Sequence, residues 1–279
     1  MLEKAGPRGV ALMGVCNVTP DSFSDGGLYE NKSAAFARVD ELLAQGADIV
    51  DVGGESTRPG ATPVHADEQI SRVLDVVRYA AERTCVSIDT TNPAVAAACL
   101  DAGACVVNDV SLLADAALAN VVAASGAALI LMHTRGSMQD MRGFSQYPED
   151  AYKDVVRDVA SEWRCAADRA ESLGVENGAL VMDPGLGYAK SARQSAELLR
   201  RTDELVREVG APVLIGASRK SFLLGLAGKG PAPNERLGAS IAAAIFAAHA
   251  GASILRVHDV RETGQAIDTM RALERGGGP

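Results

Sequence analysis

The chain has 279 residues, of which 47% are hydrophobic and 23% charged, a balance typical of globular proteins that excludes wholesale disorder. Aromatic residues make up only 4%, which disfavours a large all-β sandwich, and the net charge of −9 disfavours a general nucleic-acid binder. We see no signal peptide, and the five cysteines show no C-x-x-C spacing, so we expect a cytoplasmic protein with reduced thiols.

Eight short apolar runs, rich in β-branched residues, alternate along the chain with segments of helical pattern. Continuous apolar runs are typical of strands that are buried on both faces, as in a parallel sheet. The predicted strands are 10–17, 48–53, 85–90, 106–110, 128–133, 179–184, 213–218 and 254–258.

The segments between these runs are predicted to be helices. In one of them Ile70, Val73, Leu74 and Val77 follow the i, i+3, i+4, i+7 spacing of an amphipathic helix. The predicted helices are 33–45, 68–83, 94–101, 115–124, 151–173, 195–209, 234–250 and 262–274. Eight strands in strict alternation with eight helices predict an α/β protein of the (β/α)8 TIM-barrel type, a single domain over 1–279 with its core at about 10–274. The alternative, an open doubly wound sheet, usually has about five or six strands.

Two stretches, 116–134 and 237–255, carry no charged residue over 19 positions. Each contains His, Ser and Gly and is mostly Ala, so we interpret each as a buried helix followed by a strand. The sequence therefore predicts no membrane partner.

Polar residues stand at the end of every predicted strand. In a TIM barrel the carboxyl ends of the strands build the active site. A single polar residue there is more often a turn or cap residue, but eight at one mouth favour a bound ligand. The residues are Asn17, Asp51, Asp89, Asn108 with Asp109, His133, Asp183, Ser218 to Lys220, and Arg256 with His258.

The chemistry of these groups suggests a ligand with two parts. Donors and acceptors from separated strands suit the edges of a flat heterocycle; they are Asp89, Asn108, Asp183 and Lys220. Cationic or donor groups suit a phosphate or diphosphate; they are Arg58, Arg256 and His258. Asn17 offers a neutral oxygen for a hard ion such as Mg²⁺.

Two segments are predicted to be lids, because they contain Pro and Gly and are long for βα turns. They read TPDSFSDGG at 19–27 and ESTRPGAT at 55–62. Dinucleotide-binding, P-loop, zinc-protease and serine-hydrolase motifs are all incomplete or absent, which disfavours those classes.

Ordered motifs covering roughly 13–260 closely resemble the dihydropteroate synthases. They are GVCNVTPDSFSDGG (14–27), DIVDVGGESTRPGA (48–61), SIDT (87–90), ND (108–109), MH (132–133), DPGLGYAK (183–190), SRKSF (218–222) and RVHDV (256–260). The resemblance implies a barrel enzyme of folate biosynthesis that condenses (7,8-dihydropterin-6-yl)methyl diphosphate with 4-aminobenzoate. The products would be 7,8-dihydropteroate and diphosphate.

The resemblance also implies roles for individual residues. Asn17 would help to hold Mg²⁺ on the diphosphate, and Asp89, Asp183, Lys220 and Arg256 would be catalytic. The pterin diphosphate would contact Thr57, Arg58, Asp89, Asn108, Asp183, Lys220, Arg256, Val257 and His258. The aminobenzoate would contact Phe23, Thr57, Pro59, Tyr188, Lys220 and Ser221. The family is usually homodimeric, and the Ala-rich helices at 237–250 and 262–274 either supply that interface or simply pack on the barrel.

Three positions depart from the usual family pattern: Cys16, Met138 and Tyr188. They affect the expected detail of the second-substrate pocket. Two other functions share the same barrel: a pterin-binding methyltransferase with a corrinoid partner, and an inactive pterin-binding paralogue. The lid at 19–27 and the SRKSF run argue against the methyltransferase.

Overall fold

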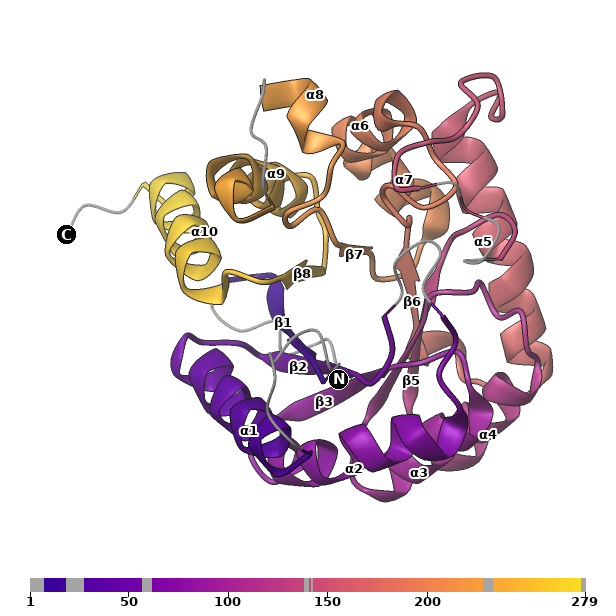
Figure 1. Cartoon of the computed structure of the whole chain (residues 1–279). Coiled ribbons are helices and arrows are strands. Elements are labelled where there is room, and N and C mark those ends of the chain that lie inside the picture. The colour runs from indigo at the N-terminus through magenta and orange to yellow at the C-terminus, as the bar shows by residue number, and fades with distance from the viewer. Residues whose placement is uncertain are drawn as a thin grey trace.

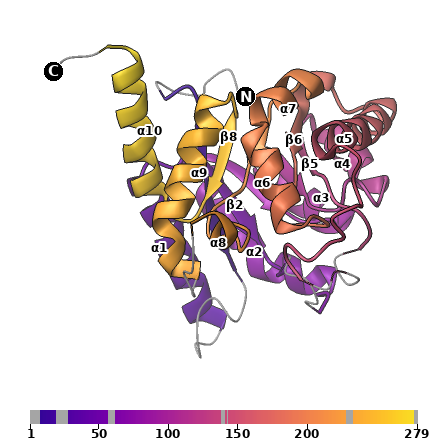
Figure 2. The same ribbon diagram turned by 90° about the horizontal axis from the view of Figure 1, so that it is seen from above.

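Eight parallel strands form a barrel with the helices outside it (Figures 1 and 2). The computed structural model describes residues 8–18, 28–56, 62–137, 141, 143–227 and 233–276. The strand order is β6-β5-β4-β3-β2-β1-β8-β7, and a parallel bridge between Met182 and Val213 joins the two ends of the sheet. The predicted TIM barrel is therefore confirmed, and the open-sheet alternative is wrong.

The strands lie close to the predicted runs. They are β1 (Ala11–Asn17), β2 (Ile49–Gly53), β3 (Cys85–Asp89), β4 (Val106–Asp109), β5 (Ala128–Met132), β6 (Leu180–Asp183), β7 (Leu214–Ile215) and β8 (Ile254–Val257). Strand β7 is much shorter than expected, because the segment after Ile215 leaves the sheet and turns toward the mouth of the barrel.

The helices differ more from their predicted bounds. They are α1 (Leu28–Ala44), α2 (Ala66–Ala81), α3 (Pro93–Asp101), α4 (Ala117–Ser125), α5 (Val155–Ser172), α6 (Ala192–Arg200), α7 (Thr202–Val209), α8 (Leu223–Ala227), α9 (Leu237–His249) and α10 (Val260–Glu274). Helix α5 begins four residues late because Asp154 caps it, accepting hydrogen bonds from two backbone N–H groups. The predicted helix at 195–209 is two helices, and the first begins early because Ser191 and Gln194 form a capping box.

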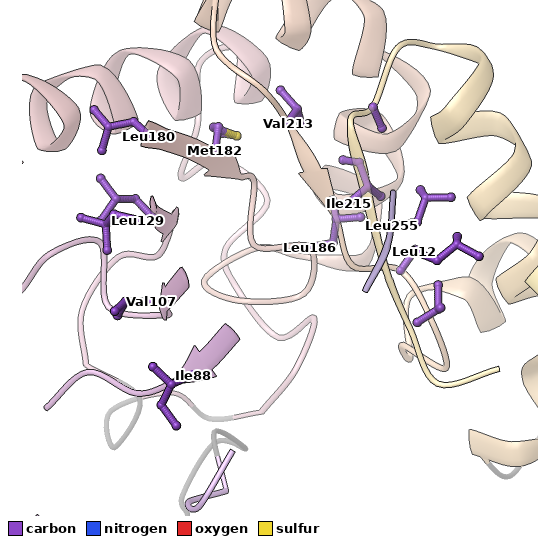
Figure 3. Packing of buried hydrophobic residues seen from close by; sticks show 14 of the residues in the cluster. Leu12, Ile88, Val107, Leu129, Leu180, Met182, Leu186, Val213, Ile215 and Leu255 are labelled. Atoms are coloured by element: carbon purple, nitrogen blue, oxygen red, sulfur yellow. The ribbon is translucent and has the colours of Figure 1, made fainter. Parts of the chain in front are cut away.

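The apolar core has two layers, one on each face of the strands. The outer layer packs the strands against the helices, and Figure 3 shows Leu12, Ile88 and Leu129 among its members. The inner layer fills the barrel with Ala11, Met13, Ile49, Val106, Ala128, Ile130, Val181, Leu214 and Ile254. Burial on both faces explains why the strand sequences are continuously apolar.

The two uncharged stretches fold as predicted, into α4 followed by β5 and into α9 followed by β8. Within the described part of the chain, no helix has the length and apolar character needed to cross a membrane.

Candidate active site

A network of charged side chains lies inside the barrel near the carboxyl ends of the strands. The Nε group of Arg256 donates to Asp51 Oδ2 at 2.7 Å, and its terminal nitrogen donates to Asp89 Oδ2 at 2.9 Å. Asn108 donates to the same oxygen of Asp51 at 3.3 Å. Asp51 is fully buried and Asp89 is only 5% exposed. The single positive charge of the Arg256 guanidinium therefore offsets the negative charges of two carboxylates that are removed from water.

Burial and ion pairing act in opposite directions on these groups. Burial raises the pKa of Asp89, while Arg256 lowers it and Asp51 adds to the rise. Burial alone would lower the pKa of Arg256, but the two carboxylates hold it above its ordinary value. The guanidinium therefore stays charged, and the site carries an excess of acceptor groups.

Several buried oxygens in this network have no hydrogen-bond partner among the described residues. They are Asp51 Oδ1, Ser87 Oγ, Asp89 Oδ1 and Asn108 Oδ1. Asp89 and Asn108 are direct neighbours in the register of β3 and β4. Because buried polar atoms almost always have partners, these two side chains are suited to accept hydrogen bonds from N–H groups of a ligand.

A second pair of charges extends the site. Asp183, at the end of β6, accepts a hydrogen bond from the Gly185 backbone at 2.7 Å. Burial raises the pKa of Asp183, and Lys220 opposes that rise. Burial lowers the pKa of Lys220 to about 8, with Asp183 acting against it. Asp183 also interacts electrostatically with Asp89 and Arg256, so the two charge groups share one mouth.

Three residues predicted for the second substrate lie together. Lys220 Nζ lies 4.7 Å from the ring centroid of Tyr188 and donates to the Leu186 carbonyl at 2.6 Å. Ser221 Oγ lies 3.3 Å from Ser145 Oγ, and the backbone N–H of Ser145 donates to Gly187. Lys220, Ser221 and Tyr188 therefore form one side of the mouth, held by the loop between β6 and α6.

Asn17 and His258 lie at the rim, where they line a cavity of about 440 Å³. The other lining residues are Val15, Arg38, Glu41, Gln45, Arg219, Asp259 and Glu262. His258 Nδ1 lies 3.0 Å from Ser218 Oγ. Burial, aided by Arg256, lowers the pKa of His258 to about 4, so the ring is neutral at pH 7.

The structure corrects two expectations at the strand ends. The Val257 side chain belongs to the outer core and does not face the mouth, because it alternates with Arg256 along β8. Asp109 accepts hydrogen bonds from backbone and hydroxyl groups of the following turn, so it is a turn residue.

Some of the predicted site lies outside the described residues. This holds for the lid at 19–27, for most of the lid at 55–62, and for the individual residues Phe23, Thr57, Arg58, Pro59 and Met138.

A buried cluster beneath Tyr188 was missed at the level of sequence. Lys190 is fully buried, and its Nζ lies 2.9 Å from His133 Nδ1, 3.0 Å from the Tyr188 carbonyl and 3.2 Å from the His133 carbonyl. His133 Nε2 lies 3.0 Å from the Glu162 carboxylate, which also pairs with Arg135.

The hydrogen bonds of this cluster define its protonation. Nε2 of His133 faces a carboxylate and carries the proton, which leaves Nδ1 as an acceptor. Burial lowers the pKa of Lys190, but three acceptors match the three N–H groups of an ammonium. Lys190 thereby ties the loop after β6 to the end of β5. Its place in the run DPGLGYAK gave no signal of burial.

Gly185 is expected to tolerate no side chain. Its φ is +62°, and a Cβ would lie 2.1 Å from the His133 carbonyl oxygen. Gly185→Ala should lower the free energy of unfolding by about 2 kcal/mol, measured by urea denaturation. Gly178→Ala is the matched control, because a Cβ there meets nothing within 4 Å. Equal stability of the two variants would contradict the strain assigned to Gly185.

Comparison with known proteins agrees with this geometry. Residues 13–258 match the model of the family described as pterin binding enzymes. The chain is 44% identical to the dihydropteroate synthase of Mycobacterium leprae, covering 94% of this chain and 93% of the relative. A structure of Xanthomonas albilineans dihydropteroate synthase with 4-aminobenzoic acid superposes with a TM-score of 0.86 at 38% identity, covering 97% and 94% of the two chains.

A longer relative contains the same unit. The chain is 43% identical to a "Probable bifunctional folylpolyglutamate synthase/dihydropteroate synthase" of Haloferax volcanii, over 95% of this chain but only 30% of that relative. The barrel and its mouth of buried acids define the class: the chain belongs to the pterin binding enzymes. Within that class, it falls among the dihydropteroate synthases.

Proposed function

We propose that this chain condenses (7,8-dihydropterin-6-yl)methyl diphosphate with 4-aminobenzoate to give 7,8-dihydropteroate and diphosphate. The observation that carries the proposal is the set of buried side chains in the mouth, where Asp89 and Asn108 each keep an oxygen that has no hydrogen-bond partner among the residues the structure describes. Asp183 and Lys220 add an acceptor and a donor from two further elements. This arrangement suits a flat ring with several N–H and C=O edges.

The same groups suit the chemistry of the pterin. Breaking the bond to the diphosphate leaves positive charge that spreads over the ring, and fixed carboxylates stabilise such charge where it develops. Asp89 and Asp183 are both buried in the mouth and are therefore poorly screened by water. The guanidinium of Arg256 holds Asp89 in place through a 2.9 Å hydrogen bond.

The second substrate requires little activation. An arylamine is nucleophilic in its neutral form, so no strong general base is needed. Lys220 and Ser221 supply donors for a carboxylate, and Tyr188 supplies an aromatic wall beside them. A sulfonamide that mimics the aminobenzoate would occupy the same side of the mouth.

We propose that Asn17 and His258 face the diphosphate and that Mg²⁺ accompanies it. The neutral ring of His258 and the exposed amide of Asn17 line the same cavity, which supports this assignment. Among the described residues, no cluster of three or more His, Cys, Asp or Glu side chains could hold a metal. A single neutral oxygen suits an ion that arrives on its phosphate ligand, where Mg²⁺ neutralises charge on the leaving group.

Mg²⁺ should therefore bind the protein weakly on its own, roughly in the millimolar range, and much more tightly with diphosphate present. Isothermal titration calorimetry with Mg²⁺ alone, and again with saturating diphosphate, measures both affinities. Tight binding of Mg²⁺ to the protein alone would contradict the assignment.

Asp183→Asn should weaken binding of the pterin diphosphate by about 1.5–3 kcal/mol, because the neutral amide loses charged hydrogen bonds to ring N–H groups. Calorimetry without aminobenzoate measures this loss. Asp101→Asn, at the exposed end of α3, is the matched control and should bind like the parent. Unchanged affinity in Asp183→Asn would remove Asp183 from the pterin pocket.

The activity is tested by incubating the protein with pterin diphosphate, Mg²⁺ and 4-aminobenzoate and measuring diphosphate release. Release that depends on aminobenzoate supports the synthase. Pterin binding without release would instead support an inactive paralogue, and methyl transfer from a methylated folate to a corrinoid protein would support the methyltransferase.

We also propose that the chain acts in the cytoplasm as a homodimer. None of the five cysteines, all of which lie in the described part of the chain, forms a disulfide, which suits a reducing compartment. Phe246 on α9 and Leu273 on α10 are 49% and 75% exposed, which supports an interface on these helices. Light scattering coupled to gel filtration tests the assembly, and a monomer at micromolar concentration would contradict it.

A further inference from the structure

Two cysteines lie on neighbouring strands at the end of the barrel opposite the active site. Cys85 is the first residue of β3, and Cys105 directly precedes β4. Both side chains pack against the apolar cluster inside the barrel, and both are partly exposed. The same two strands carry Asp89 and Asn108 to the mouth at their other end.

The two thiols interact directly. They share a side-chain hydrogen bond, which lowers the pKa of Cys105 and raises that of Cys85. The Cys105 thiol also donates to the Val86 carbonyl, with 3.6 Å between Sγ and the oxygen. The pair therefore places two thiols within reach of each other, and the lowered pKa of Cys105 favours it as the attacking thiol.

The other cysteines lack this combination. Cys16 and Cys99 lie in the outer core, and burial raises the pKa of each thiol to about 12. Cys165 is exposed on α5, outside the barrel. Thiol reactivity requires both access and a stabilised thiolate, so the pair on β3 and β4 is distinguished by chemistry as well as by position.

We propose that Cys85 and Cys105 form a modification site at which hydrogen peroxide or a related hydroperoxide closes a disulfide. The Cys105 thiolate attacks one peroxide oxygen, the O–O bond breaks, and the departing hydroxide takes a proton to become water. The thiol of Cys85 then attacks Sγ of the Cys105 sulfenic acid, the S–O bond breaks, and a second water leaves with the Cys85 proton. Two thiols are oxidised by two electrons while one peroxide is reduced to two waters.

The backbone N–H of Cys105 donates to the Val86 carbonyl, so Cys105 lies opposite Val86 and is offset by one residue from Cys85. A strand spacing of about 4.8 Å and an offset of about 3.3 Å place the two Cα atoms about 6 Å apart, within the span that a disulfide bridges. The bond would cross-link β3 to β4 at the floor of the barrel, and thiol reductants would reverse it. The peroxide would reach both thiols from the amino-terminal end of the barrel, so it would not need to enter the mouth where the substrates bind.

The test treats the full-length protein with hydrogen peroxide, then blocks the remaining thiols with N-ethylmaleimide in denaturant, which exposes the buried Cys16 and Cys99, and measures the intact mass. We expect a loss of 2 Da and three alkylated thiols. Cleavage before aspartate separates the cysteines, because Asp89 lies between Cys85 and Cys99 and Asp101 lies between Cys99 and Cys105. The disulfide-linked peptides should be those of Cys85 and Cys105.

Two variants assign the roles. Cys85→Ser should leave Cys105 as a sulfenic acid that dimedone traps, and Cys105→Ser should slow peroxide consumption at least tenfold. Cys165→Ser is the matched control and should form the disulfide as the parent does. A linkage through Cys165, or alkylation of all five thiols after peroxide treatment, would overturn the proposal. Peptide mapping of the parent protein decides the matter even if a variant does not fold.

Discussion

Replacing Arg256 with methionine is expected to lower the free energy of unfolding by about 3–5 kcal/mol, because the change leaves two buried carboxylates without their cation. Ionised Asp51 and Asp89 can only accept hydrogen bonds. Both accept from the Arg256 guanidinium, whose nitrogen atoms lie 2.7 Å from Asp51 Oδ2 and 2.9 Å from Asp89 Oδ2. Their burial makes the unpaired charge costly. Urea denaturation at pH 7 measures the loss, and the variant should also show no turnover.

Two controls test the origin of this effect. Arg207→Met removes a similar ion pair with Asp203, but both side chains are largely exposed and stability should stay near that of the parent. Adding Asp51→Asn to Arg256→Met should recover part of the lost stability, because one unpaired charge disappears. If Arg256→Met unfolds like the parent, the carboxylates are not dependent on this cation.

Protonation of His133 should cost about 3 kcal/mol of stability as the pH is lowered from 6.5 toward 4, measured as the difference between the parent and a variant that lacks this ring. Burial lowers the pKa of His133 from 6.5 to about 4, with Lys190 acting in the same direction. Between these values the unfolded chain binds a proton that the folded chain does not, so acid favours unfolding. The pKa of His258 is lowered in the same way and acts in the same direction, whereas the raised pKa values of Asp89 and Asp183 act in the opposite direction. Urea denaturation at pH 7.0, 6.0, 5.0 and 4.5 measures the slope.

The contribution of His133 is isolated by substitution. His133→Gln should reduce the pH dependence between 6.5 and 4, although the variant is less stable at pH 7 because Lys190 and Glu162 lose a partner. His65→Gln, at an 81% exposed side chain, should retain the full pH dependence. The same pH dependence in His133→Gln as in the parent would show that the pKa of His133 is not lowered in the folded chain.

The strands were the most predictable part of the fold. Each apolar run is buried on both faces, so hydrophobicity alone located all eight. Helix ends were less predictable, because capping by Asp154 and Ser191 depends on local backbone geometry. The brief helix α8 and the break at Arg201 gave no periodic signal.

The site was predictable where residue type and strand position coincide. Asp89 and Asp183 are the last residues of their strands, and Asn108 and Arg256 are the last but one. All four reach the mouth together, as the barrel geometry predicts. The Val257 side chain points to the outer core because side chains alternate along a strand. The prediction from strand ends did not take this alternation into account. The burial of Lys190 could not be predicted, because it depends on a loop that folds back onto His133 and Glu162 from other parts of the chain.

The closure between β6 and β7 gives the barrel a seam. Other neighbouring strands share between two and five register pairs. Here a single bridge between Met182 and Val213 is supplemented by one hydrogen bond from the Met182 N–H to the Pro212 carbonyl. Asp183 and Lys220 stand on opposite sides of this seam. A ligand that binds both side chains therefore connects β6 and β7 where the fewest backbone contacts join neighbouring strands. Because such a ligand binds only the closed barrel, substrate binding stabilises the fold at this position.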